Sequence, residues 1–250
     1  SGFETNMPLG ATGWSSATIN DSDEIGYRAG IGFSGDAYYS YNGVDSATQH
    51  VADSGVEPSS PYVFLFSPDF NNDRQIAGKV RLEDAFDDDS PDQVRIFETD
   101  QSSTLMAEDN DSNSKSPYDS FDNSVSLNDN GAVAFIASMA SGARAVVLAN
   151  SPDDHVTIAS EDNPDIDEIV FFPPDVNNNG LVAFRAFDGD GNDAIFVGDG
   201  DNLVRVIGRG DEIPTDLGPG QINQNNPGDP AFGGAVSIND QLLTPIAGIA

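Results

Sequence analysis

The sequence predicts an all-β protein, a β-propeller of about five four-stranded antiparallel blades. A short pattern recurs five times, with its asparagine at positions 20, 71, 128, 177 and 239, so the spacings are 51, 57, 49 and 62 residues. Repeat periods near 50 residues are typical of propeller blades rather than of helical solenoids. The segments between these asparagines are short apolar runs joined by Asn, Asp and Gly turns, and none shows a sustained helical period.

Each repeat places an apolar residue before an asparagine and a polar turn after it. We call these residues the anchor asparagines: Asn20, Asn71, Asn128, Asn177 and Asn239. The clearest copies, SLNDNGAVAFIA (126–137) and DVNNNGLVAFRA (175–186), share N-x-N-G-x-V-A-F-x-A. We expect each anchor side chain to bond nearby backbone as in an Asx turn, and the glycine three residues later to adopt a positive φ. In the following strands we expect Tyr27, Phe135 and Phe184 to be core residues.

The repeats divide one domain, 1–250, into modules. Their approximate ranges are 16–60, 61–115, 123–165, 168–215, and 232–250 together with 1–15. In the fourth module the predicted strands are 169–176, 181–187, 194–197 and 203–207, which is the layout of an antiparallel meander. The connectors 108–122 and 208–234 are expected to be long surface loops.

The fifth module has only two apolar runs, 235–238 and 242–250. Residues 1–15 could complete this blade, so that the N-terminal and C-terminal strands pair and close the ring. The alternative is that the chain is a piece of a longer repeat domain, because Leu242 replaces the turn glycine and Pro245 interrupts the strand.

Charge is the strongest compositional signal, since 10 basic and 42 acidic residues give a net charge of −32. Such a surface repels phosphate groups, so we expect no nucleic-acid partner and no binding to anionic lipid. It suits cations and saline surroundings, as in halophilic or marine proteins. The chain has no cysteine, which excludes disulfides and thiolate metal sites. No apolar stretch approaches the roughly 18 residues of a transmembrane helix, so membrane insertion is not expected.

Three modules place a cation eight residues after the anchor asparagine, at Arg28, Lys79 and Arg185. One interpretation is an ion pair between blades. The other is a ring at one mouth of the channel that binds an anionic ligand such as a uronate carboxylate.

Calcium is the one cofactor that the sequence suggests. The turn of Asp188, Asp190, Asn192 and Asp193 is rich in oxygen ligands, although it is also an ordinary hairpin composition. A second stretch, 175–180, fits only the front half of a calcium loop, because Ala183 and Ala186 stand where the later ligands would be.

Catalytic signals are weak. The only histidines, His50 and His155, fall in the fourth predicted run of their modules, far from the channel where propeller sites usually lie. A polysaccharide lyase could use a His or Tyr base with an Arg that neutralises the uronate, and His50, Tyr27 and Arg28 supply these residue types.

The segments N-x-x-G-x-V-A-F, A-I-F-V-G-D-G (194–200) and V-I-G-R-G-D-E-I-P (206–214) resemble secreted bacterial tandem-repeat proteins, including the HAF-like extracellular repeats. The resemblance covers residues 16–250 in pieces and is strongest over 126–214. It implies a β-propeller and an extracellular or periplasmic location, but no reaction.

We therefore expect a secreted, acidic β-propeller that acts as a binding or structural module, with glycan or cations as ligands and a polysaccharide or another extracellular protein as partner. The first alternative is a glycan-degrading enzyme, such as a lyase acting on anionic polysaccharide. The second is a subunit of an extracellular assembly, formed through the apolar run 242–250.

Overall fold

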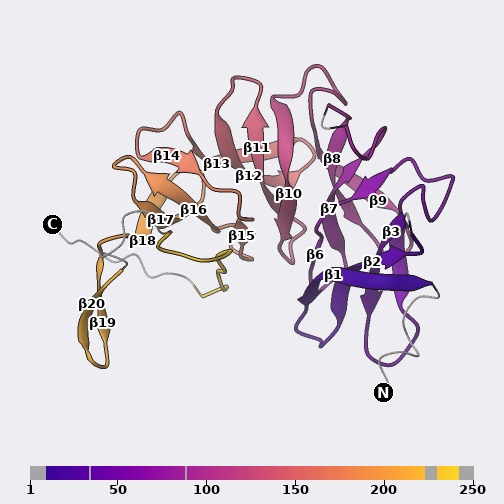
Figure 1. Ribbon diagram of the computed structural model, residues 1–250, viewed down its shortest axis with the longest axis horizontal. Coiled ribbons are helices and arrows are strands. Elements are labelled where there is room, and N and C mark those ends of the chain that lie inside the picture. The colour runs from indigo at the N-terminus through magenta and orange to yellow at the C-terminus, as the bar shows by residue number, and fades with distance from the viewer. Residues whose placement is uncertain (1–9, 34, 88, 223–229, 242–250) are drawn as a thin grey trace.

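A computed structural model describes residues 10–33, 35–87, 89–222 and 230–241, and this part of the chain contains strands and turns but no helix. Four antiparallel sheets of four or five strands follow one another along the chain. In Figure 1 they form an arch, from β1 at the lower right over β11 at the top to β18 at the left. The prediction of an all-β protein is confirmed. No helix that could cross a membrane occurs in the described ranges.

Sheets one and three are four-stranded meanders in sequence order. Sheet one comprises β1 (Ala11–Ile19), β2 (Ile25–Ile31), β3 (Gly35–Tyr41) and β4 (Thr48–Ala52). Sheet three comprises β10 (Tyr118–Leu127), β11 (Val133–Met139), β12 (Arg144–Ser151) and β13 (Asp154–Ser160). Because every strand pairs with its chain neighbour, each sheet is built from local hairpins, as the turn chemistry predicts.

Sheets two and four follow the same plan, but their first strand is split in two. Sheet two comprises β5 (Phe64–Leu65), β6 (Asp69–Phe70), β7 (Ile76–Arg81), β8 (Asp92–Phe97) and β9 (Ser103–Glu108). Sheet four comprises β14 (Ile166–Ile169), β15 (Asp175–Val176), β16 (Val182–Asp188), β17 (Asp193–Gly198) and β18 (Leu203–Gly208). Pro68 lies in the first break, and Pro173 and Pro174 lie in the second. A proline has no N–H to donate, so pairing stops there.

The last part of the chain differs from the predicted layout. Residues 208–234 were expected to be a loop, but they contain a hairpin of β19 (Glu212–Thr215) and β20 (Gly218–Gln221), which projects at the lower left of Figure 1. The predicted run 235–238 is not a strand, and the run 242–250 lies outside the described residues. Residues 11–15, expected to complete a fifth blade, lie in β1 and pair with β2.

Most of the core lies between the sheets, and a smaller apolar cluster that contains Tyr27 lies within sheet one. One apolar cluster joins sheets two and three, a second joins sheets three and four, and a third joins sheets one and two. Phe135 and Phe184 are fully buried and Tyr27 is 5% exposed, which confirms these core predictions. Since both faces of the middle sheets are covered, their strands are apolar on both faces, as in VAFIA (133–137).

Candidate functional site

The anchor asparagines hold their own turns. The side-chain oxygen of Asn128 accepts the backbone N–H groups of Asn130 at 3.0 Å and Ala132 at 2.9 Å. Asn20, Asn71 and Asn177 accept the equivalent pairs of N–H groups, and Asn239 accepts the first of them. These are the Asx turns that the sequence predicts.

The residue three after the anchor asparagine has a positive φ in each of the four repeats where the structure describes it, although glycine occupies this position only twice. Gly131 and Gly180 have φ of 78° and 77°, as predicted, while Asp23 and Arg74 occupy the same position at 60° and 62°. The turn geometry is therefore common to repeats with and without glycine, and the side-chain bonds of the anchor help to hold it.

Each anchor also bonds the next repeat. Its amide nitrogen donates to the backbone carbonyl of the following anchor, over 3.4 Å from Asn20, 3.0 Å from Asn71, 3.0 Å from Asn128 and 2.9 Å from Asn177. We call this series the anchor ladder. It runs through all five repeats, which line one small opening of about 250 Å³. The anchors therefore join the repeats to one another and do more than shape turns.

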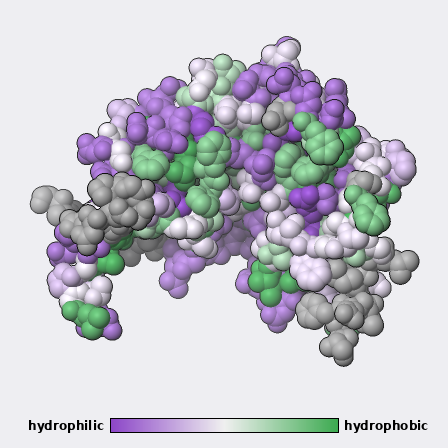
Figure 2. Space-filling model, viewed as in Figure 1, coloured by the Kyte–Doolittle hydropathy of each residue, from purple (hydrophilic) through white to green (hydrophobic). Residues whose placement is uncertain are grey.

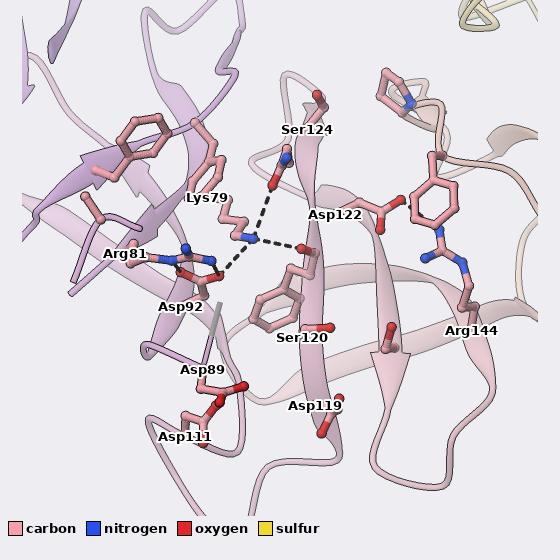
Figure 3. A pocket seen from close by; sticks show the side chains of 18 of the residues that line it. Lys79, Arg81, Asp89, Asp92, Asp111, Asp119, Ser120, Asp122, Ser124 and Arg144 are labelled. Carbon is pink, nitrogen blue, oxygen red and sulfur yellow. Dashed lines mark hydrogen bonds and ion pairs between the residues drawn. The ribbon is translucent and has the colours of Figure 1, made fainter. Parts of the chain in front are cut away.

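A much larger cleft, about 910 Å³, lies at the junction of sheets two and three (Figure 3). It is the main candidate binding site. Aromatic rings line it from both sides, together with carboxylates, hydroxyls and three cations: Phe64, Phe66, Phe86, Phe121, Phe171, Asp89, Asp92, Asp111, Asp119, Asp122, Ser120, Ser124, Lys79, Arg81 and Arg144.

The floor of the cleft is a buried ion cluster. Lys79 and Arg81 lie on the same face of β7 and share the carboxylate of Asp92 from β8. Nζ of Lys79 lies 2.8 Å from that carboxylate and donates to the carbonyl of Phe121 at 2.8 Å, and Arg81 makes two bonds of 2.8 and 3.0 Å (Figure 3). The three side chains are 3% to 7% exposed. Two cations share one carboxylate, so these three side chains together carry a formal charge of +1.

The rim of the cleft is more open. Asp89, Asp111 and Asp119 are exposed there and make no ion pair with any described residue. Phe86 is 95% exposed, and Phe171 is 75% exposed while it stacks on the guanidinium of Arg144 at 4.0 Å. Exposed aromatic rings next to exposed carboxylates give the rim both apolar and hydrogen-bonding surface.

The three repeat-position cations lie in three different sheets, and each pairs with an aspartate of its own sheet. Besides the Lys79 cluster, Arg28 bonds Asp36 at 2.7 Å, and Arg185 bonds Asp193 at 3.1 Å. Each also reaches the neighbouring repeat: Arg28 stacks on Phe64, Lys79 bonds Phe121, and Arg185 donates to the carbonyl of Gly234. Only Lys79 lines the large cleft. The structure thus gives all three contacts between adjacent repeats, and it does not gather them at one mouth.

The predicted calcium turn is held by protein contacts. One oxygen of Asp188 accepts the N–H groups of Asp190 and Asn192, and the other lies 2.9 Å from Arg205. Asp193 points elsewhere, because it is fully buried against Arg185. No group of three or more acidic or histidine side chains with metal-binding geometry occurs in the described residues. Calcium binding at this turn stays a prediction.

The lyase candidates do not meet in one cleft. His50 is fully buried on β4, where its ring contacts the hydroxyl of Ser40 at 2.9 Å and the carbonyl of Phe97 at 3.3 Å. Burial lowers its pKa from 6.5 to about 4. Tyr27 and Arg28 are consecutive on β2 and so face opposite sides of sheet one. Burial, followed by the charges of Tyr39 and Tyr41, raises the pKa of Tyr27 to about 12.

Both histidines join neighbouring sheets. His155 on β13 contacts the hydroxyl of Tyr118 at 2.7 Å and the carbonyl of Met106 in sheet two at 2.8 Å. As predicted, His50 and His155 lie on the last strands of their sheets.

Sequence reasoning missed the cleft itself, because its lining comes from an acidic connector, an exposed loop and two different sheets. The local signals were Phe86, a single aromatic residue within an acidic run, and the Phe171–Phe172 pair before two prolines in the break between β14 and β15.

Comparison with known proteins gives one family. Residues 42–242 match a family described as a family of unknown function, DUF7453. No curated protein matches the chain.

Proposed function

This chain belongs to the DUF7453 family, and we propose that it is a secreted β-propeller that binds a neutral glycan in the cleft between sheets two and three. The single observation that carries the ligand class is the exposed aromatic and acidic rim of that cleft. The resemblance to secreted tandem-repeat proteins supports the location.

The propeller arrangement is supported by the anchor ladder. All five repeats contribute equivalent residues to one opening, and each sheet runs outward from that opening as an antiparallel meander. Successive sheets pack face to face through apolar clusters. Blades arranged around a central channel share both features.

The glycan is supported by the surface chemistry of the cleft. The C–H faces of a sugar ring pack on aromatic rings such as Phe86 and Phe171, and sugar hydroxyls donate to carboxylates such as Asp111 and Asp119. The cleft is lined by side chains of both sheets two and three, so an extended chain could make contacts on two sides. The face drawn in Figure 2 is mainly hydrophilic with separate apolar patches, which suits local contacts with a polar ligand.

The charge distribution favours a neutral glycan over a uronate. Lys79 and Arg81 share the one carboxylate of Asp92, and Arg144 is paired with Asp122 at 2.8 Å. The whole lining has three cations and five carboxylates, a formal charge of −2. The charges left on the rim are the carboxylates of Asp89, Asp111 and Asp119, which would repel a polyanion.

Calorimetric titration with neutral and uronic-acid oligosaccharides tests this proposal. Phe86→Ala and Phe171→Ala should each weaken binding of a neutral oligosaccharide about tenfold, as expected for the loss of an aromatic contact. Phe33→Ala is the matched control, since Phe33 is fully exposed outside the cleft and its loss should leave the affinity unchanged. Tighter binding of uronates at the cleft, or equal affinity of all three variants and the unsubstituted protein, would reject the proposal.

A further inference from the structure

The residue that follows each anchor alternates between acid and amide. The series is Asp21, Asn72, Asp129, Asn178 and Asp240. The residue two before each anchor also alternates, between hydroxyl and acid: Thr18, Asp69, Ser126, Asp175 and Ser237. The repeats are therefore of two kinds. The odd kind, repeats one, three and five, reads hydroxyl-x-Asn-Asp, and the even kind, repeats two and four, reads Asp-x-Asn-Asn.

The first alternation is required by hydrogen bonding. The amide nitrogen of Asn72 donates to Asp21 and to Asp129, both at 2.9 Å. The amide nitrogen of Asn178 donates to Asp129 at 2.7 Å and to Asp240 at 2.9 Å. An amide has two N–H groups and an ionised carboxylate has none. Each asparagine thus satisfies two aspartates, whereas two neighbouring aspartates would repel each other without a donor between them.

The second alternation follows the same logic. The hydroxyl of Ser126 donates to Asp175 at 3.0 Å, and the other oxygen of Asp175 accepts the N–H of Ile238 at 2.7 Å. Asp69 accepts the N–H of Leu127 at 2.8 Å and a hydrogen bond from the side chain of Thr18. A hydroxyl of an odd repeat therefore needs the carboxylate of the next even repeat.

Among the described residues, repeat five ends the series with donors that bond no further repeat and repeat one begins it with acceptors that bond no earlier repeat, but both repeats are of the odd kind. No hydrogen bond joins repeat five to repeat one in the described residues. Repeat five presents the donors that each earlier repeat uses, the amide of Asn239 and the N–H of Asp240. Repeat one presents the acceptors, the carbonyl of Asn20 and a carboxylate oxygen of Asp21. Direct closure would place the carboxylate of Asp240 against that of Asp21 with no donor between them. It would also place Ser237 against Thr18, where every other junction pairs a hydroxyl with a carboxylate. Head-to-tail docking of a second copy would fail for the same reason.

We propose that the gap between repeats five and one is filled by a sixth repeat of the even kind, Asp-x-Asn-Asn, so that the ring has an even number of members. Its asparagine would satisfy Asp240 and Asp21 together, and its aspartate would accept the hydroxyl of Ser237. In this sequence Asp-x-Asn-Asn occurs only at 69–72 and 175–178, which are already repeats two and four. The sixth repeat therefore comes from polypeptide outside residues 1–250. This inference does not depend on what the cleft binds.

A labelled peptide tests the gap. The probe is the even-kind segment PPDVNNNGLVAFRA (173–186), titrated against the intact chain by fluorescence anisotropy. The control peptide carries Asp175→Ser and Asn178→Asp, which convert it to the odd kind without a change of net charge. The even peptide should bind at least about tenfold more tightly than the control, the size expected for two hydrogen bonds to charged groups.

A reciprocal change in the protein distinguishes specific recognition of the peptide from nonspecific binding. In a protein with Asp21→Asn and Asp240→Asn, the peptide that carries Asn178→Asp alone should bind more tightly than the unchanged peptide. Equal binding of the even and odd peptides to the unsubstituted protein would overturn the proposal, as would no binding by either.

Discussion

The anchor ladder and the large cleft are both built where neighbouring repeats meet, yet they use opposite kinds of sequence. In the ladder, every repeat contributes equivalent atoms at nearly equal distances, 2.9 to 3.4 Å. In the cleft, Lys79 and Asp92 form the same kind of pair as Arg28–Asp36 and Arg185–Asp193, but the third member, Arg81, is replaced by Gly30 and Phe187 at the equivalent positions of sheets one and four. The difference teaches that the repeated positions specify architecture, while specific chemistry resides in the positions that break the repeat.

The largest effect is expected for an anchor in the middle of the ladder. Asn128→Ala removes the acceptor for two backbone N–H groups and the donor to the carbonyl of Asn177, in a site that is 5% exposed. At about 1 to 1.5 kcal/mol for each of the three lost bonds, the free energy of unfolding should fall by about 3 to 4.5 kcal/mol. Asn239→Ala, which removes one described bond at an exposed end, should cost about 1 kcal/mol. Urea denaturation measures both, and equal losses would contradict the view of the ladder as a cooperative structure.

His50 lies outside the repeat pattern, and its burial should make the stability of the fold depend on pH. Burial holds the pKa of His50 at about 4, below its ordinary 6.5. Above pH 7 the ring is neutral in both states and contributes no pH dependence. As the pH falls from 6.5 to 4 the unfolded chain binds the proton first, so stability decreases by up to about 3 kcal/mol. His50→Gln should flatten this part of the stability profile, as measured by thermal unfolding between pH 7 and pH 4. An unchanged slope would show that His50 is not the group responsible.

Replacing one amide nitrogen with an oxygen, as in Asn178→Asp, breaks the alternation of acid and amide after the anchors. Asn178→Asp places three carboxylates in a row, at 129, 178 and 240, and removes two amide donors. We expect a loss of about 2 kcal/mol at pH 7, from the lost bonds and the added repulsion, and a smaller loss in high salt, where exposed charges are screened. Asn179→Asp, one residue further, is the matched control: it adds the same charge but removes only one donor, to the carbonyl of Asp240. If both variants lose the same stability at low and high salt, alternation has no special role.

The smallest effect on stability is expected in the cleft. Phe86→Ala removes a side chain that is 95% exposed, so the unfolding temperature should change by less than the equivalent of about 0.5 kcal/mol. Glycan binding should nevertheless fall as described above. A large loss of stability would show that this ring packs against the core and would blur the distinction between architecture and binding.

The sequence predicts the architecture well because its information is local. An anchor asparagine, a turn and an apolar run together define a hairpin, and β16, β17 and β18 agree with the predicted strands 181–187, 194–197 and 203–207 to within one residue at each end. The breaks at Pro68, Pro173 and Pro174 could have been read from the same chemistry. The hairpin 212–221 could not, because its strands carry no apolar alternation.

The candidate site was much less predictable. A spacing of eight residues singled out Arg28, Lys79 and Arg185 as a set, but it could not reveal that each has an aspartate partner in its own sheet. With 42 acidic residues in the chain, the partner of a given cation has no sequence signature. The cleft depends on how two sheets diverge, which is a property of packing between modules rather than of any module alone.

The ladder also predicts which repeats unfold locally first. Each rung connects only adjacent repeats, so a rung in the middle can break only if its neighbours strain or separate, whereas an end rung has one neighbour. Amide protons report this directly. The N–H of Ala132, held by Asn128 between two intact rungs, should exchange with deuterium far more slowly than the N–H of Gln241, held by Asn239 at the end. Local unfolding should therefore become easier along the row of asparagines, from the middle repeats toward the end where the next repeat would attach.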